Sequence, residues 1–158
     1  VLELLQLPII PNGLKKAYIP GRFQILPGAI TCILDVAHNP LGAKILQATL
    51  QQHSNTGQTH IILGMLNKKD SLGFINIIKD SITSWHIAPL NTSSTASAQQ
   101  LTDNLTSIGI KNITCYPSIT KAYENLIHEV KDGDRILITG SFYTVAEVFH
   151  NCCETDSF

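Results

Sequence analysis

The feature that most constrains the fold is a regular alternation between two kinds of segment. Short apolar runs rich in isoleucine, leucine and threonine alternate with longer segments whose apolar residues recur at helical spacing. Such an alternation is typical of a parallel sheet with helices on both faces, because parallel strands are joined by crossovers of about a dozen or more residues. We therefore expect an α/β domain.

The expected elements follow from this periodicity. The strands are 30–36, 59–64, 84–88, 112–116 and 135–139, with 23–26 as a sixth. The helices are 41–52, 71–82, 98–108, 119–130 and 143–149. Only Pro27-Gly28 and a few residues join 23–26 to the next strand, so this pair is expected to be antiparallel. The prediction is a Rossmann-like three-layer domain whose six-stranded sheet is mostly parallel, with one antiparallel edge strand and helices on both faces.

Start signals support the predicted helices. Asp70, Ser97 and Ser118 each stand just before a helical segment, where a side-chain oxygen can accept a hydrogen bond from the first turn. By contrast, residues 1–20 contain several prolines and Asn12-Gly13, which break any long element. We interpret 1–20 as a linker or the tail of a preceding domain, and the start at Val1 suggests that the chain is a fragment.

Composition excludes several classes of protein. A chain of 158 residues with 44% hydrophobic and 15% charged residues is sufficient for one domain with a substantial core. The formal charge is -1 and the lysines are scattered, so no electrostatic footprint for nucleic acid or a membrane surface is present. No apolar run approaches the ~20 residues of a membrane span, and no basic signal-peptide region precedes the first leucines, so a cytoplasmic location is expected.

The four cysteines do not indicate a metal centre or a disulfide framework. Cys32 and Cys115 fall in strand-like runs, whereas Cys152 and Cys153 are adjacent. Neither zinc-ligand spacing nor the pattern of a secreted, disulfide-stabilised domain results, so we expect reduced thiols.

The hexapeptide Asp35-Val36-Ala37-His38-Asn39-Pro40 has the pattern of a strand, an acidic turn and a helix start. A carboxylate at the carboxyl end of a buried strand faces the crevice in which α/β sheets bind ligands. Two simpler interpretations remain open. Asp35 can stabilise its own turn by accepting amide hydrogen bonds, and His38 can be a structural residue, since no second histidine at ligand spacing supports a metal.

Other loops at predicted strand ends carry weaker signals. Lys68 and Lys69 follow Gly64 and can face a phosphate or simply be solvated, while Gly140-Ser141 can hold an anion at a helix N-terminus or only cap the helix. Arg22, in a turn ahead of the edge strand, can clamp a phosphate or extend along the surface. A parallel sheet would bring these loops to one side. No P-loop, dinucleotide fingerprint or nucleophile elbow is present in the sequence. The loops would therefore supply only about half of an active site.

Together these blocks identify a family by resemblance. They are Pro20-Gly21-Arg22-Phe23-Gln24, the Asp35 to Pro40 hexapeptide, Gly64-Met65-Leu66, Lys69-Asp70, Ala88-Pro89-Leu90 and Gly140-Ser141-Phe142-Tyr143-Thr144-Val145-Ala146. In this order they resemble the C-terminal domain of bacterial bifunctional dihydrofolate synthase/folylpolyglutamate synthase, a relative of the Mur ligases. The resemblance covers residues 21–158, which would be the glutamate ligase domain, and makes 1–20 a linker or the tail of a preceding ATPase domain.

The resemblance implies an ATP-dependent ligase. Such an enzyme phosphorylates the carboxylate of dihydropteroate or a folate, with help from magnesium, and the amino group of L-glutamate then attacks the acyl phosphate. The P-loop and the magnesium ligands belong to the preceding domain, and the C-terminal domain closes over the nucleotide. This chain alone is therefore expected to be an inactive, monomeric part that supplies no metal ligand.

The resemblance also assigns site residues. Arg22 would meet phosphate oxygens of ATP, and Asp35 would contact the ribose or a bound-water network. His38 would be the catalytic-site histidine, positioning groups beside the reaction centre. Gly140, Ser141 and Lys69 would bind substrate, the first two holding glutamate.

The sequence departs from the family pattern in the loop after Leu90, and two alternative functions remain. Many relatives continue after the Ala88-Pro89-Leu90 block to a Pro-Arg pair, whereas here residues 91–95 read Asn-Thr-Ser-Ser-Thr. Whether this enzyme extends a polyglutamate tail or adds only the first glutamate thus stays open. The alternatives are a stand-alone Rossmann-like module that binds a nucleotide or an amino acid, and a Mur-type peptidoglycan ligase domain.

Overall fold

The computed structural model describes residues 21–26, 28 and 30–153, with side chains to residue 149. The predicted linker at 1–20 and Pro27 of the predicted turn lie outside these residues. The strands are β1 (Gln24–Leu26), β2 (Thr31–Leu34), β3 (Thr59–Leu63), β4 (Ser84–Ile87), β5 (Ile113–Cys115) and β6 (Arg135–Thr139). The helices are α2 (Pro40–Gln52), α3 (Ser71–Ile78), α4 (Ala98–Ser107), α5 (Ile119–Glu129) and α6 (Phe142–Cys153), with a short 3₁₀ turn η1 (Lys79–Ser81).

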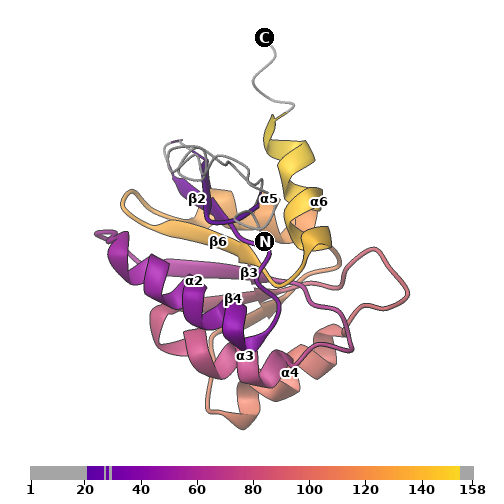
Figure 1. Cartoon of the computed structure of the whole chain (residues 1–158). Coiled ribbons are helices and arrows are strands. Elements are labelled where there is room, and N and C mark those ends of the chain that lie inside the picture. The colour runs from indigo at the N-terminus through magenta and orange to yellow at the C-terminus, as the bar shows by residue number, and fades with distance from the viewer. Residues whose placement is uncertain (1–20, 27, 29, 154–158) are drawn as a thin grey trace, which may run out of the picture.

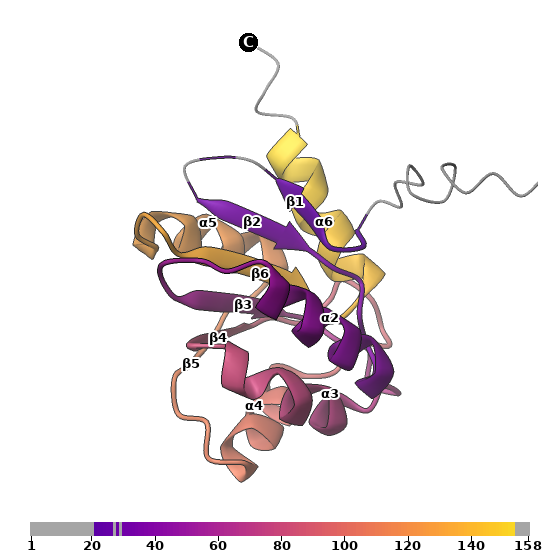
Figure 2. The ribbon, with the colours of Figure 1, turned by 60° about the vertical axis from the view of Figure 1, so that its left-hand side comes forward.

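The strands form one six-stranded sheet in the order β1-β2-β6-β3-β4-β5 (Figure 1 and Figure 2). The pair β1–β2 is antiparallel, with Ile25 opposite Ile33, and every other pair is parallel. This confirms the predicted mixed sheet and its antiparallel edge. The last strand, β6, lies between β2 and β3, so the strand order reverses there, and the carboxyl ends of these three strands border the switch point at which α/β sheets bind ligands.

Helices cover both faces of the sheet (Figure 2). Side chains of α2, α3 and α4 pack on one face, and those of α5 and α6 pack on the other. Within β6, Leu137 belongs to the first core while Ile136 and Ile138 belong to the second. Because both faces are buried, the central strands are continuous apolar runs, as the sequence showed.

Three predicted helix starts are confirmed by hydrogen bonds. The side chains of Asp70, Ser97 and Ser118 each accept from the backbone N–H three residues later, at 2.8, 3.1 and 3.2 Å. Several boundaries differ from the prediction by one to four residues, and α6 ends at Cys153, four residues later than expected. The strand expected to reach residue 36 ends at Leu34, because Asp35 and Val36 begin a turn whose amides bond to Ile138 and Gly21. The helix expected to reach residue 82 ends at Ile78 and tightens into η1.

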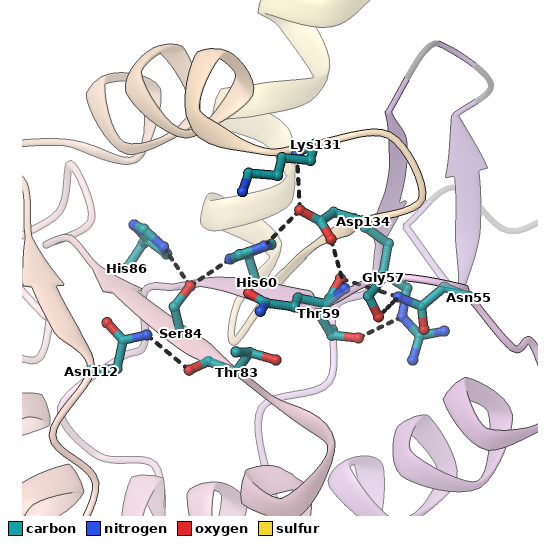
Figure 3. A network of polar contacts seen from close by, with 12 residues as sticks. Asn55, Gly57, Thr59, His60, Thr83, Ser84, His86, Asn112, Lys131 and Asp134 are labelled. Atoms are coloured by element: carbon teal, nitrogen blue, oxygen red, sulfur yellow. Dashed lines mark hydrogen bonds and ion pairs between the residues drawn. The ribbon is translucent and has the colours of Figure 1, made fainter.

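A row of hydrogen-bonded polar side chains crosses the sheet from Asp134, just before β6, to Tyr116, just after β5, and Figure 3 shows its part from Asp134 to His86. His60 Nε2 lies 3.4 Å from Asp134 Oδ2, and His60 Nδ1 lies 2.7 Å from Ser84 Oγ. The same Ser84 oxygen is 2.8 Å from His86 Nε2, whose Nδ1 is 3.1 Å from the Tyr116 hydroxyl. A carboxylate can only accept, so with both rings neutral every donor points toward Asp134, from Tyr116 through His86, Ser84 and His60.

Among the residues that the structure describes, no helix is long and apolar enough to span a membrane.

Candidate active-site cleft

A cleft of about 360 Å³ opens at the carboxyl end of the sheet. Its lining comes from the turn before β1, the turn after β2, the first turns of α2 and the start of α6, and includes Arg22, Asp35, His38, Leu41, Ile45 and Phe142. The structure thus brings the three residues predicted for ATP and catalysis into one cleft.

Asp35 is held by two backbone amides. Its Oδ2 accepts from the N–H of Phe23 at 2.9 Å, and its Oδ1 accepts from the N–H of Ala37 at 2.8 Å. Burial raises the pKa of the Asp35 carboxyl, and these two amides together with nearby Arg22 counteract part of that effect. The turn-stabilising interpretation of Asp35 is therefore correct, and each oxygen still has a second lone pair that a ligand hydroxyl or water can use.

Arg22 is exposed on the turn formed by residues 21–24, which we call the Arg22 turn. Gly21 has φ +73°, and a Cβ there would lie 2.9 Å from Val36 Cγ1, so glycine suits this close approach. The Gly21 carbonyl accepts from the N–H of Val36 at 2.7 Å, and its N–H donates to Gln24 Oε1 at 3.0 Å. The Arg22 turn is thus tied to the Asp35 turn on one side and to β1 on the other.

One ring nitrogen of His38 is already used in a hydrogen bond within the protein. Nδ1 lies 2.9 Å from the Val36 carbonyl oxygen, which can only accept, so Nδ1 carries a proton. Nε2 is then the ring atom available to a ligand. The next residue, Asn39, caps α2 through its Oδ1 and the N–H of Gly42 at 2.8 Å, so the first turn of α2 fixes where His38 stands.

Gly140 joins three strand ends. Its N–H donates to the Ala37 carbonyl at 3.0 Å, and a Cβ on it would lie 2.6 Å from the Gly64 carbonyl oxygen. The Gly64 carbonyl also accepts from the Thr144 hydroxyl at 2.7 Å. The loops after β2, β3 and β6 therefore converge, as the parallel sheet predicted.

The residues predicted to bind substrate do not line the cleft. Ser141 is 4% exposed, and its Oγ accepts from the N–H of Tyr143 at 3.2 Å, so its hydroxyl serves as a cap of α6. Lys69 is half-buried in the loop after β3, where its backbone N–H donates to the Leu66 carbonyl at 3.1 Å. For Gly140, Ser141 and Lys69, contact with glutamate or another substrate stays a prediction.

Sequence reasoning missed the apolar wall of the cleft. Leu41, Ile45 and Phe142 are 70%, 63% and 59% exposed, although large apolar side chains are normally buried. Leu41 and Ile45 are four residues apart and so lie on one face of α2. That spacing, on the side of α2 opposite to the buried Ala43, was the signal available in the sequence.

A second hollow, of about 630 Å³, lies on the α5–α6 side and is lined in part by Asn91, Ser118 and Tyr143. Its charged lining residue is Glu147, whose Oε1 accepts from the N–H and the hydroxyl of Thr120, both at 3.1 Å. The N-terminus of α5 is thus already satisfied by a carboxylate. For an anionic ligand such as a nucleotide, the cleft with Arg22 is the better site.

Comparison with known families decides the relationship. Residues 21–142 match the family described as "Mur ligase, glutamate ligase domain". The chain belongs to this family. The match begins at Gly21 of the Arg22 turn and ends at Phe142 of the cleft, so it contains every cleft residue named above.

Two curated relatives of the Mur ligase domain are dihydrofolate synthase/folylpolyglutamate synthases. The protein of Escherichia coli is 34% identical over 139 residues, which cover 88% of this chain and 32% of the relative. The protein of Buchnera aphidicola from Acyrthosiphon pisum is 37% identical over 139 residues, or 88% of this chain and 33% of the relative. The chain therefore spans about a third of the length of these relatives.

Solved structures show the same relationship for the Mur ligase domain. E. coli FolC in complex with DHPP and ADP superposes with a TM-score of 0.88 at 32% identity, covering 99% of this chain and 37% of that one. A bifunctional folylpolyglutamate synthase/dihydrofolate synthase with Mn, AMPPNP and L-glutamate bound superposes with a TM-score of 0.87 at 32% identity, covering 97% and 37%. The fold predicted from the sequence is that of these C-terminal domains.

Proposed function

We propose that this Mur ligase domain is the C-terminal part of an ATP-dependent ligase that joins L-glutamate to dihydropteroate, to folates, or to both. The observation that carries the proposal is the cleft at the strand-order switch, where exposed Arg22 stands beside Asp35 and His38. The names of the relatives, and the ADP, AMPPNP and L-glutamate in the names of the solved structures, support this choice of substrates.

Each predicted site residue has a role in this proposal. Arg22 binds phosphate oxygens of ATP and stabilises the charge that develops during phosphoryl transfer. Asp35, with a lone pair left on each oxygen, accepts from a ribose hydroxyl or from water bound there. His38 presents Nε2 beside the reaction centre and positions the reacting groups. Gly140, Ser141 and Lys69 are proposed to contact glutamate or the acceptor.

In this proposal the reaction proceeds in two steps, formation of an acyl phosphate and its attack by glutamate. A carboxylate oxygen of the acceptor attacks the γ-phosphorus of ATP, the bond to the bridging oxygen breaks, and ADP leaves. The amino nitrogen of L-glutamate then attacks the acyl carbon, inorganic phosphate leaves, and the nitrogen loses its extra proton to form the amide. Magnesium would neutralise charge on the phosphates, and we expect its ligands, with the P-loop, in a domain upstream.

The exposed apolar wall supports the existence of such a domain. Leu41, Ile45 and Phe142 border the cleft and lie at the edge that the upstream domain would approach on closure. The ligase is further proposed to be monomeric and cytoplasmic.

The test is glutamate-dependent release of ADP by the chain together with the natural sequence that precedes it. Dihydropteroate and a reduced folate are supplied separately. We expect release that requires L-glutamate and at least one acceptor, and we expect Arg22→Ala to lower kcat/KM for ATP about 10- to 100-fold.

Other outcomes would point to the alternatives. Release with neither folate acceptor, but with a peptidoglycan precursor, would identify a Mur-type peptidoglycan ligase. The absence of release with every acceptor, together with tight nucleotide or amino-acid binding by this domain alone, would identify a binding module.

A further inference from the structure

The backbone of Phe23 is strained at the entrance to the cleft. Its φ is +44°, and among the residues that the structure describes it is the one non-glycine residue with a positive φ. An aromatic side chain disfavours this left-handed conformation, so the surrounding structure must hold it there.

Two contacts hold Phe23 in place. Its N–H donates to Asp35 Oδ2 at 2.9 Å, across 12 residues of sequence. Its ring lies 4.8 Å from the ring of His53, at the end of α2, and packs against the buried core below α2. The strained residue is therefore fixed from both its backbone and its side chain.

This bend determines where Arg22 lies. The φ of Phe23 is a rotation about the bond that joins the Arg22 peptide to the Cα of Phe23, one residue before β1 begins. Changing it from positive to negative would swing Arg22 away from Asp35 while leaving β1 in the sheet. We infer that Phe23 is a positioning residue of the ligase, whose left-handed backbone aims Arg22 into the cleft. This inference rests on the proposed function.

Two substitutions at Phe23 separate the effect of its backbone conformation from the effect of its ring. Glycine adopts a positive φ without steric cost but removes the ring, whereas valine keeps apolar volume but resists a positive φ because it is β-branched. If the backbone conformation matters for catalysis, Phe23→Gly is the milder variant. If the ring itself matters, Phe23→Val is the milder variant.

The experiment measures steady-state kinetics of the full-length ligase. We expect Phe23→Gly to keep kcat/KM for ATP within about threefold of wild type, and Phe23→Val to lower it about tenfold or more, while KM for the folate acceptor changes little in both. In an Arg22→Ala background, Phe23→Val should add little further loss, because the group that it positions is gone.

Controls separate this inference from the proposed function. Thermal melting identifies a variant that fails to fold. Phe23→Asn, which also tolerates a positive φ, replaces Phe23→Gly if that variant fails, and Phe23→Ala, whose Cβ disfavours a positive φ, replaces Phe23→Val and should still lower kcat/KM for ATP more than Phe23→Gly does. A wild-type enzyme without glutamate-dependent ADP release would refute the proposed function. A working wild type in which glycine is as damaging as valine, or in which valine costs as much without Arg22, would overturn the inference about Phe23.

Discussion

Replacing Gly140 with alanine is expected to lower the free energy of unfolding by about 3 to 5 kcal/mol, the sum of a backbone penalty and a steric one. Gly140 has φ +106°, a conformation that an L side chain rarely adopts. An added Cβ would also lie 2.6 Å from the Gly64 carbonyl oxygen, which belongs to the backbone and already accepts from Thr144. The carbonyl cannot move aside without separating the ends of β3 and β6.

Gly109→Ala is the matched control for this prediction. Gly109 also has a positive φ, +85°, but a Cβ there would meet nothing within 4 Å. It should therefore cost only the backbone penalty, about 1 kcal/mol. Urea unfolding of both variants measures the difference. Equal losses would show that the close approach of Gly140 to Gly64 does not contribute.

The second large effect is a loss of stability in mild acid, caused by His86. Burial first, and the neighbouring His60 second, lower the pKa of His86 to about 4. The unfolded chain protonates this histidine near its ordinary pKa of about 6.5. As the pH falls from 6.5 to 4, protons therefore bind preferentially to the unfolded chain, and the folded protein should lose about 3 kcal/mol.

Two carboxyl groups modify the acid response. Hydrogen bonds from the amides of Lys131 and Gln58 lower the pKa of Asp134, so its contribution is lost only as the pH falls below its ordinary range. Burial raises the pKa of Asp35, so protonation of Asp35 in acid relieves a cost and partly offsets the loss. The loss caused by His86 begins near pH 6.5, well above the ordinary pKa of an aspartate.

His86→Gln isolates the contribution of His86. Glutamine can both donate and accept in the chain of polar contacts, but it cannot take up a proton. We expect the free energy of unfolding, measured with guanidinium chloride from pH 7 to pH 4.5, to fall steeply for wild type and only weakly for the variant. Parallel curves for the two proteins would contradict the assignment.

Local signals predicted the elements of the fold well, and non-local contacts set the limits of that prediction. The caps at Asp70, Ser97 and Ser118 were predictable because each acts within three residues. The insertion of β6 between β2 and β3 was not, because no local pattern records which strands become neighbours. The row of polar side chains from Tyr116 to Asp134 could not be predicted for the same reason, since His60 meets Ser84 only through the register of β3 with β4.

The candidate site shows the same division. The Asp35 hexapeptide and Arg22 were found because residue type and position at a strand end indicate a ligand-binding crevice. The backbone of Phe23 could not be found this way, because phenylalanine normally avoids a positive φ and is held there by an aspartate 12 residues away. Strain of this kind appears only in three dimensions, and it appears beside the proposed nucleotide site.

The most direct test of the central claim follows an oxygen atom through the reaction. The full-length enzyme is given ATP, L-glutamate and an acceptor, dihydropteroate or a folate, whose reacting carboxyl carries ¹⁸O. If the acceptor carboxylate attacks ATP and glutamate then displaces phosphate, one labelled oxygen must appear in inorganic phosphate for each amide formed. Amide formation with unlabelled phosphate, or ATP consumption without amide, would contradict the assignment of this domain to a glutamate ligase that works through an acyl phosphate.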